Sequence, residues 1–223
     1  ISIAGSGGLK RNVKIRGNVI VDCFSVVGTV GHGIYIANTS GLLIEGNVID
    51  HNGWNTNFTG AVPSVFRHGI YLQQSGSNSG HVVRNNIISN SASHGLQMRN
   101  GGTVFNNLFT NNSIGFLLGG GDAGIAGGVE VDAYGNVIIH GKNLDGSNAR
   151  GWGVTAENIS VGRFSGNIIA HRQSGTFPIS FEASSSTYPV YDLEFDNNIV
   201  YKWGQGPEFD GPSASYNTVK IRN

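Results

Sequence analysis

Short stretches in which apolar and polar residues alternate recur along the whole chain, and turns rich in Gly and Asn separate them. The clearest stretch reads His-Gly-Ile-Tyr-Ile at residues 32–36; its third and fifth positions stay apolar in every copy while the fourth varies. The copies stand at residues 32–36, 68–72, 94–98, 114–118, 152–156 and 177–181. Alternation with a period of two is typical of a β-strand with one buried face, so each copy predicts a short strand.

A second phrase, an Asn followed by two apolar residues, lies between these copies. Its members are Asn18, Asn47, Asn86, Asn107, Asn136, Asn167 and Asn198, with gaps of 29, 39, 21, 29, 31 and 31 residues. A constant motif at varying spacing indicates a repeat unit that carries insertions of different length. Because Asn tolerates left-handed backbone and its amide can hydrogen-bond to the Asn one repeat away, we expect an Asn ladder at a corner of a coil. The Gly that often precedes the Asn would serve the same bend.

A strand of three to five residues cannot bury its inner face alone, whereas stacked strands can, at a spacing of roughly 4.8 Å between rungs. No window carries the i, i+3, i+4, i+7 pattern of an amphipathic helix. The sequence therefore predicts an all-β chain, folded as a single-stranded parallel β-helix, a solenoid of about seven or more rungs.

The expected β-helix domain spans residues 1–223. The first residues already read as strand and turn, so we expect this domain to be the C-terminal part of a longer chain, with any export signal upstream. After Asn198 the sequence departs from the repeat and contains Trp203, Pro207 and Pro212. We expect residues 203–223 to return over the last rung and cap the open edge of the core.

Both phrases together resemble the repeat of right-handed parallel β-helix proteins of the pectate-lyase-like superfamily, and the resemblance runs from about residue 12 to 198. It implies a right-handed coil. The superfamily includes polysaccharide lyases, C5 epimerases, glycoside hydrolases, adhesins and tailspikes, so the resemblance is specific for fold and not for activity.

Charge and composition narrow the partners. Lys plus Arg and Asp plus Glu both count 14, which gives no reason to expect nucleic acid or an anionic membrane as a partner. No apolar run approaches the roughly 20 residues of a membrane-spanning helix. The single Cys23 excludes an intrachain disulfide. We expect a polysaccharide partner and a secreted, periplasmic or cell-surface location; the oligomeric state stays open.

Strand parity predicts an outward polar strip on the early rungs. The strip comprises Tyr35, Arg67, Tyr71, Gln73, Gln97 and Arg99. Neighbours one rung apart would lie about 5 Å from each other. Aromatic, amide and guanidinium groups in one strip suit a chain of sugars that bear carboxylates, although exposed Tyr and solvated Arg also occur on strands without a function.

The phrase also places His32, His68 and His94 in one column. One interpretation is a corner ladder in which each imidazole caps a backbone group, and the other is a catalytic or ligand-binding role. A three-His metal site is disfavoured because stacked side chains point in parallel and do not converge on one ion.

The longest gap between repeats comes from an insertion at residues 50–66, which contains Trp54. Long loops on a rigid coil concentrate function, so Trp54 either stacks on a sugar ring or covers the side of the coil. Two further segments, residues 119–128 and 141–150, would add to the wall of a groove.

The chemistry that fits best is elimination from a uronic acid, by a lyase or the related C5 epimerase. Arg67 and Arg99 would hold the carboxylate, His68 or His94 would take the C5 proton, and Tyr71 would be the acid or the base. The expected substrate contacts are Tyr35, His32, Gln73, Gln97, Trp54 and Glu157. No cofactor is demanded, and a Ca²⁺ site lacks support because Asp50 and Glu45 are too few carboxylates near the basic residues.

Two alternatives remain. Glu157 and Glu182 are expected in one outward column on consecutive rungs, at a spacing of order 5 Å that suits a retaining glycoside hydrolase. Otherwise the chain is a rigid glycan-binding module without turnover, such as an adhesin or tailspike part.

Overall fold

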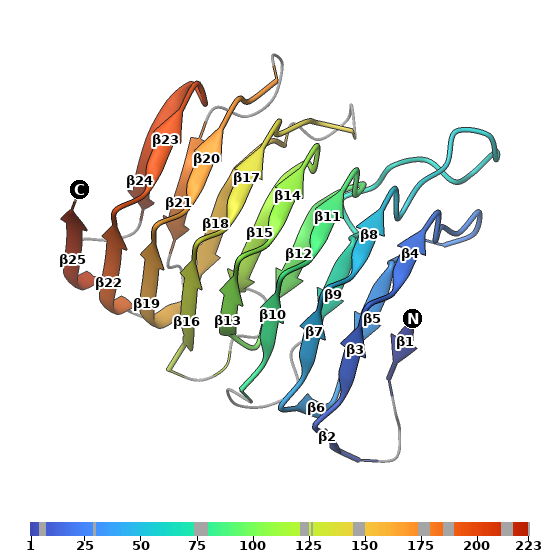
Figure 1. Cartoon of the computed structure of the whole chain (residues 1–223), viewed down its shortest axis with the longest axis horizontal. Coiled ribbons are helices and arrows are strands. Elements are labelled where there is room, and N and C mark those ends of the chain that lie inside the picture. The colour runs from blue at the N-terminus through green and yellow to red at the C-terminus, as the bar shows by residue number, and fades with distance from the viewer. Residues whose placement is uncertain are drawn as a thin grey trace.

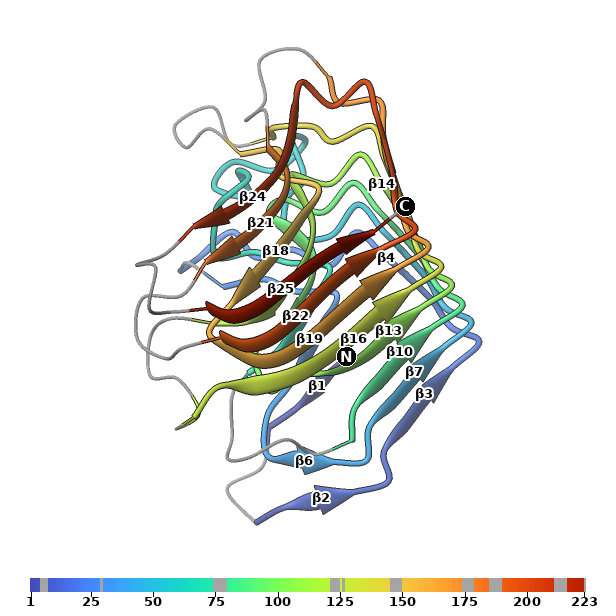
Figure 2. The same ribbon diagram turned by 90° about the vertical axis from the view of Figure 1, so that its left-hand side faces the viewer.

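The computed structural model describes residues 1–4, 8–28, 30–73, 80–120, 125, 127–144, 150–173, 179–184, 190–210 and 216–222. Within these ranges the regular structure is entirely β, and the strands form three long parallel sheets that run along a coil (Figures 1 and 2). In each turn the chain visits the three sheets in the same order, as in β7 (Leu43–Glu45), β8 (Val48–Asp50) and β9 (Ile70–Leu72), which belong to three different sheets. This arrangement confirms the predicted right-handed parallel β-helix.

Sheet 1 consists of β1 (Ser2–Ile3), β5 (Ile34–Ile36), β9 (Ile70–Leu72), β12 (His94–Met98), β15 (Ile114–Gly119), β18 (Val154–Glu157), β21 (Ile179–Ser184) and β24 (Gln205–Asp210). Sheet 2 consists of β3 (Lys14–Arg16), β7 (Leu43–Glu45), β10 (Val82–Arg84), β13 (Gly102–Phe105), β16 (Val129–Tyr134), β19 (Ile159–Ser165), β22 (Val190–Asp196) and β25 (Tyr216–Arg222). Sheet 3 consists of β4 (Val19–Val21), β8 (Val48–Asp50), β11 (Ile87–Ser89), β14 (Leu108–Thr110), β17 (Val137–Ile139), β20 (Ile168–Ala170) and β23 (Ile199–Tyr201). A small extra pair joins β2 (Lys10–Arg11) to β6 (Thr39–Ser40).

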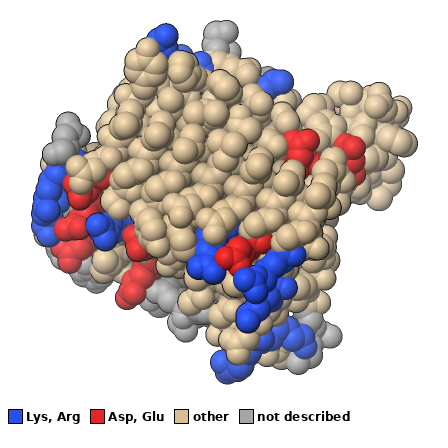
Figure 3. All heavy atoms as spheres, viewed as in Figure 1, with Lys and Arg blue, Asp and Glu red and all other residues tan. Residues whose placement is uncertain are grey.

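The outer surfaces of the sheets differ in charge. Sheet 2 carries ion pairs between rungs, such as Arg16 and Arg84 on either side of Glu45, each at 2.6 Å. The outer face of sheet 3 is largely aliphatic, and the centre of the face in Figure 3 is almost free of charged side chains. One outward column of sheet 3, formed by the first residue of each strand, consists of Val19, Val48, Ile87, Leu108, Val137, Ile168 and Ile199.

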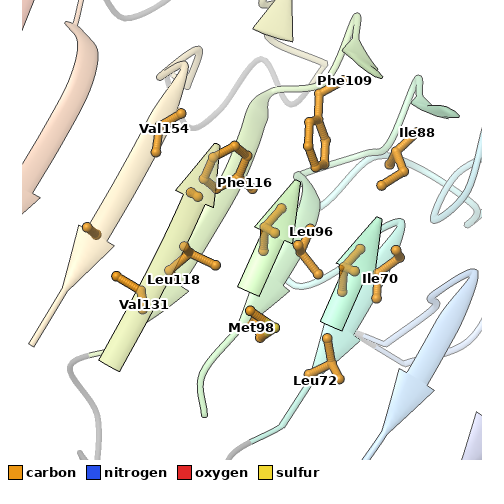
Figure 4. Packing of buried hydrophobic residues seen from close by; sticks show 14 of the residues in the cluster. Ile70, Leu72, Ile88, Leu96, Met98, Phe109, Phe116, Leu118, Val131 and Val154 are labelled. Carbon is orange, nitrogen blue, oxygen red and sulfur yellow. The ribbon is translucent and has the colours of Figure 1, made fainter. Parts of the chain in front are cut away.

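The core is a stack of the inward residues that the alternation predicted (Figure 4). Ile70 lies over Leu96, and Leu72 over Met98, each buried by 99% or more. Sheet 3 contributes the column of Ile88 and Phe109 to the same interior. Because each inner side chain rests on the equivalent one in the next rung, the apolar surface of all rungs is buried in one continuous cluster.

The repeated Asn residues form the predicted ladder at the corner between sheets 2 and 3. The Asn107 amide donates to the Val83 carbonyl at 2.9 Å and to Asn136 Oδ1 at 3.0 Å, and its own Oδ1 accepts from the backbone and side chain of Asn86. The left-handed residue is the one before the Asn, with φ of 53° at Asn106 and 61° at Gly135. The ladder Asn thus supplies hydrogen bonds, while the preceding Gly or Asn supplies the bend.

The expected alignment of Glu157 in β18 with Glu182 in β21 was wrong. Thr155 pairs with Glu182 and Glu157 pairs with Ser184, so Glu157 and Glu182 do not share a column. The expected register was wrong by two residues. A shift of two leaves the inward and outward faces unchanged, so the alternation of apolar residues could not detect it.

The tail also differs from the expected cap. Within residues 203–223, β24 pairs in parallel with β21 and β25 with β22, so the segment adds strands to sheets 1 and 2 instead of folding back across them. Trp203 is buried and belongs to the core cluster. Pro207 is accommodated in β24, the last strand of sheet 1, where a missing backbone N–H is tolerated. Pro212 lies outside the described residues.

In the part of the chain that the structure describes, no helix reaches the length and apolar character needed to cross a membrane.

Asn107→Ala is expected to destabilise the coil by about 2–4 kcal/mol, because the Asn86 amides and the Val83 carbonyl lose their buried partners. The free energy of unfolding is measured by urea titration.

Asn106→Gly is the matched control. Gly occupies the equivalent left-handed position at Gly135, so this change is expected to alter stability by at most about 1 kcal/mol. Equal losses for the two variants would contradict the ladder as a source of stability.

Candidate functional site

A groove runs across the outer face of sheet 1, at right angles to its strands. Its central pocket has a volume of about 430 Å³, and a second hollow of about 450 Å³ continues from it toward β1. Val30, His32 and Tyr71 line both hollows, so they form one continuous groove. The central pocket is lined by Val30, His32, Val65, Phe66, His68, Tyr71, His94, Gln97, Arg99, Leu117, Arg150 and Glu157.

The His-Gly phrase is explained by how closely the rungs approach at this edge. A side chain at Gly33 would place its Cβ 2.7 Å from the Gly69 carbonyl oxygen, and one at Gly69 would meet the Gly95 carbonyl at the same distance. Only Gly fits there, because real Cβ atoms do not come so near to backbone. Each Gly therefore fixes the preceding His at the same corner of its rung.

The three histidines form a stacked ladder. The His32 and His68 rings lie 5.2 Å apart and nearly parallel, and the His68 and His94 rings lie 4.8 Å apart and tilted. The backbone N–H of His68 donates to His32 Nδ1 at 3.2 Å, and that of His94 donates to His68 Nδ1 at 3.4 Å. The His32 and His68 imidazoles do cap backbone groups, whereas the His94 ring contacts side chains, and all three histidines line the groove.

Burial keeps these rings neutral. Burial lowers the pKa of His32 to about 4. Burial first, and the neighbouring His94 and His32 rings next, hold the pKa of His68 well below its usual value. For His94 the main cause of the lowered pKa is again burial, followed by the positive charges of Arg150 and Arg99.

The hydrogen bonds assign the tautomers. Since Nδ1 accepts a hydrogen bond in His32 and His68, each neutral ring carries its proton on Nε2 and is a donor at that atom. His94 differs: its Nδ1 lies 3.1 Å from both His68 Nδ1 and Ser93 Oγ, so a proton on Nδ1 satisfies both neighbours. The buried Nε2 atom of His94 then has a lone pair and no hydrogen-bond partner.

Tyr71 and Arg99 form the second part of the site. Arg99 Nε donates to Tyr71 Oη at 3.2 Å, so the hydroxyl accepts from Arg99 and its own proton can be donated elsewhere. The Tyr71 ring also packs edge-on against His68, with centroids 5.1 Å apart. A Cβ at Gly120 would collide with the Arg99 guanidinium, so the Gly at this position makes room for that side chain.

Sequence reasoning missed Arg150. It arises from the segment before β18, lines the central pocket, and places its guanidinium carbon 5.8 Å from the Trp152 ring centroid. Residue 150 had been assigned only to the expected groove wall, and no repeat phrase covers it. Of the two segments expected as wall, residues 121–124, 126 and 145–149 lie outside the described residues.

Arg67 does not stand on the predicted strip. Its side chain is 3% exposed, and its guanidinium donates to the carbonyls of Val62 at 2.8 Å and Gly28 at 2.9 Å. The alternation of inward and outward positions predicts only the direction of the Cβ atom. The long Arg67 side chain turns beneath the insertion and holds the insertion against the coil. Arg67 is therefore an anchor of the loop whose residues Val65 and Phe66 line the pocket.

Trp54 also lies away from the groove lining. Its indole N–H donates to the Asn90 carbonyl at 2.9 Å, and its ring packs against His51 at 4.2 Å. It covers the side of the coil, the second of the two expected roles. Phe66, 59% exposed, is the aromatic residue of this insertion that lines the central pocket within the described part of the chain.

The remaining strip residues do gather. Tyr35 and Tyr71 lie on neighbouring rungs with ring centroids 5.7 Å apart, and Tyr35 Oη donates to Gln73 Oε1 at 2.6 Å. Gln97 pairs with Tyr71 in the strand register and lines the central pocket. Glu157, on β18, also lines that pocket.

Among the described residues, no group of three or more His, Cys, Asp and Glu side chains has an arrangement that could hold a metal ion.

The stacked sheets define a solenoid, and the groove on the outer face of sheet 1 runs along one side of it. The family described as the right handed beta helix region matches residues 1–126, more than half of the sequence, and the chain belongs to this family. Its fold is of a type found in carbohydrate-active proteins. No curated protein and no solved structure matches the chain.

The melting temperature is expected to fall as the pH drops from 6.5 toward 4. The unfolded chain binds protons on histidine with a pKa of about 6.5, whereas folded His32 does so only near 4, so acid favours unfolding across this interval and the effect levels off below it. Each kcal/mol lost lowers the melting temperature by about 2–4 °C. Circular dichroism melts at constant ionic strength measure it.

His32→Asn retains an acceptor for the His68 N–H but cannot titrate, so its melting temperature should fall less steeply over the same interval. A slope identical to that of the unsubstituted chain would show that His32 is not buried as a neutral ring.

Proposed function

We propose that the chain binds an acidic extracellular polysaccharide in the groove on sheet 1 and cleaves it by β-elimination. The observation that carries the proposal is that one pocket is lined by a tyrosine, two arginines and a histidine whose lowered pKa keeps it neutral. An elimination needs those three kinds of group: a cation for the carboxylate, a base for the C5 proton and an acid for the leaving oxygen. Such a substrate would place the protein in the secreted, periplasmic or cell-surface compartment.

Arg99 and Arg150 are the residues that would receive the uronate carboxylate. Both guanidinium groups lie close enough to His94 to lower its pKa, so both act on the same pocket. Charge-assisted hydrogen bonds from Arg stabilise a carboxylate and the additional charge that builds up as the C5 proton leaves. The Nε2–H groups of His32 and His68 provide further donors.

His94 is the proposed base. The residue lines the pocket, and its buried Nε2 atom has no hydrogen-bond partner. The proposed step requires the ring to turn Nε2 toward the groove when substrate binds, and no hydrogen bond of Nε2 opposes this movement. The lowered pKa keeps the lone pair available at neutral pH. His68, the other candidate, carries its proton on the atom that faces away from the ladder, so it is a donor instead.

The proposed step balances without a cofactor. His94 Nε2 takes the C5 proton, the electrons of the C5–H bond form the C4–C5 double bond, and the C4–O4 bond breaks. The leaving oxygen takes a proton from Tyr71 Oη, which Arg99 holds in place. Proton return from His94 to Tyr71 restores the site.

A C5 epimerase would use the same first half of the reaction. If the C4–O4 bond survives, a donor on the opposite face returns a proton to C5 and inverts that carbon. Deuterium incorporation at C5 without an unsaturated product would distinguish epimerisation from elimination.

Hydrolysis by a carboxylate pair fits less well. Glu157 is the one carboxylate among the described residues that line the central pocket, and Glu182 pairs with Thr155 outside its column. A binding module without turnover is the second candidate function, because binding a polysaccharide requires the groove and no proton-transfer groups.

Tyr71→Phe and His94→Asn are each expected to lower the rate of elimination by about 100-fold or more, because proton transfer in the transition state loses its acid or base. The rate is followed by the ultraviolet absorbance of the unsaturated product, on a panel of uronate polysaccharides.

Tyr134→Phe and His81→Asn are the matched controls. Tyr134 lies on the outer face of sheet 2, and His81 is a buried His whose Nδ1 accepts the Leu42 N–H at 3.4 Å, away from the groove. Both controls should keep the full rate. Binding without product by every variant and by the unsubstituted chain would instead support a binding module.

A further inference from the structure

Basic side chains gather on and beside one part of sheet 2. The strands β2, β3, β6, β7 and β10 together carry five cations and one carboxylate. The cations, called the basic patch below, are Lys10, Arg11, Lys14, Arg16 and Arg84. The whole chain has 14 basic and 14 acidic residues, so the excess is local and does not reflect the net charge. Figure 3 shows blue side chains gathered at the lower right, where Figure 1 places β2, β3 and β7.

The side chains of the basic patch are open to solvent. On β3 the order exposed, buried, exposed places Lys14 and Arg16 on the outer face, with Ile15 in the core. Lys10 and Arg11 on β2 are also exposed. Outward side chains of a parallel β-helix are not covered by the rungs on either side, because each rung extends the sheet within its own surface. The basic patch is therefore available to a partner in solution.

One carboxylate neutralises only part of the patch. Glu45 lies between Arg16 and Arg84, each at 2.6 Å, and the hydrogen bond from Arg16 holds the pKa of its carboxyl below the usual value. The side chains of the other three cations form no hydrogen bond or ion pair with the residues that the structure describes. Several positive charges therefore stay available to a ligand.

The carboxylates farther along sheet 2 are too distant to cancel the patch. The strand β13, which follows β10 in the sheet, carries no charged residue, and carboxylates return on β16 at Glu130 and Asp132. Lys14 and Arg16 on β3 lie four rungs from β16 in the order of the sheet, or about 19 Å. Exposed charges are largely screened beyond about 10 Å at 0.1 M salt.

A polymer with repeated negative charges fits this surface. Its anionic groups can pair with several exposed cations at once, and an ion pair at one cation raises the effective concentration of the polymer at the next. An acidic polysaccharide fits better than single-stranded nucleic acid. Proteins that bind single strands offer aromatic side chains on which the bases stack, and the five strands of the patch carry no aromatic residue.

We propose that the basic patch is a second contact site for the acidic polysaccharide, outside the groove, and that it favours long chains over short ones. The choice of polymer rests on the proposed function, because the same chain would enter the groove. A chain held at both places binds more tightly than a chain held in the groove alone, and the positive charge speeds its arrival. The patch takes no part in proton transfer.

The test removes three cations of the patch together, by Lys10→Gln, Arg11→Gln and Lys14→Gln. Calorimetry measures binding of polygalacturonate, polymannuronate and polyglucuronate and of their tetramers, in the Tyr71→Phe background so that the polymer is not consumed. For the accepted polymer at low salt, the affinity is expected to fall about 10-fold, because several weak exposed ion pairs are lost. The affinity for its tetramer is expected to stay the same.

The matched control removes three exposed cations elsewhere, by Arg163→Gln, Lys202→Gln and Arg222→Gln in the same background. It changes the net charge by the same amount and should keep the affinity for the polymer. The difference between the two triple variants should disappear near about 1 M salt, where the screening length falls to about 3 Å.

The outcomes separate the two proposals. Equal affinities of the two triple variants for the long polymer, or an equal loss for the tetramer, would overturn the second contact site and leave the proposed function standing. Tighter binding of single-stranded DNA than of every polysaccharide would overturn the choice of partner. Binding that depends on the patch, without elimination by the unsubstituted chain, would overturn the proposed elimination and leave the patch. No binding of any polymer would overturn both.

Discussion

The buried hydrogen bonds at the corners of the coil are the constraint on which the rest of the structure depends. A chain that turns three times per rung around a dry core must satisfy every peptide group at the bend. The Asn ladder does this in two ways. An inner member such as Asn107 donates to a carbonyl of the preceding rung and accepts from the backbone and side-chain amides of the Asn in that rung. The corners are thereby fixed, and the strands between them need only three residues.

This rigid stack gives the groove its geometry. The residues of the site come from strands β5 to β18 of sheet 1 and from the loops beside them, and the spacing of those on the strands is set by the distance between rungs. The histidine ladder links structure and chemistry directly. Because His32 and His68 use Nδ1 to accept the next backbone N–H, their tautomers are imposed by the fold. In the third ring of the ladder, that of His94, the buried Nε2 atom has no hydrogen-bond partner.

The sequence pattern was sufficient for the fold, the core columns and the gathering of Tyr35, Tyr71, Gln97 and Arg99 along one groove. It could not place Arg67, because alternation reports the direction of Cβ and not the path of a long side chain. It could not detect the two-residue shift that separates Glu157 from Glu182, since both registers bury the same kind of residue. Arg150 lay in an insertion without periodicity, where only the folded chain shows what it contacts.

The insertion at residues 50–66 leaves the coil after β8 and returns before β9, and Arg67 secures its end beneath Gly28 and Val62. The shortest repeat, 21 residues between Asn86 and Asn107, shows how little chain a complete turn requires. Everything beyond that length is free to vary in evolution without disturbing the stack. A lineage can therefore exchange the groove wall, and with it the range of ligands, by mutation and indel in one loop, while the proton-transfer groups on the strands are inherited unchanged.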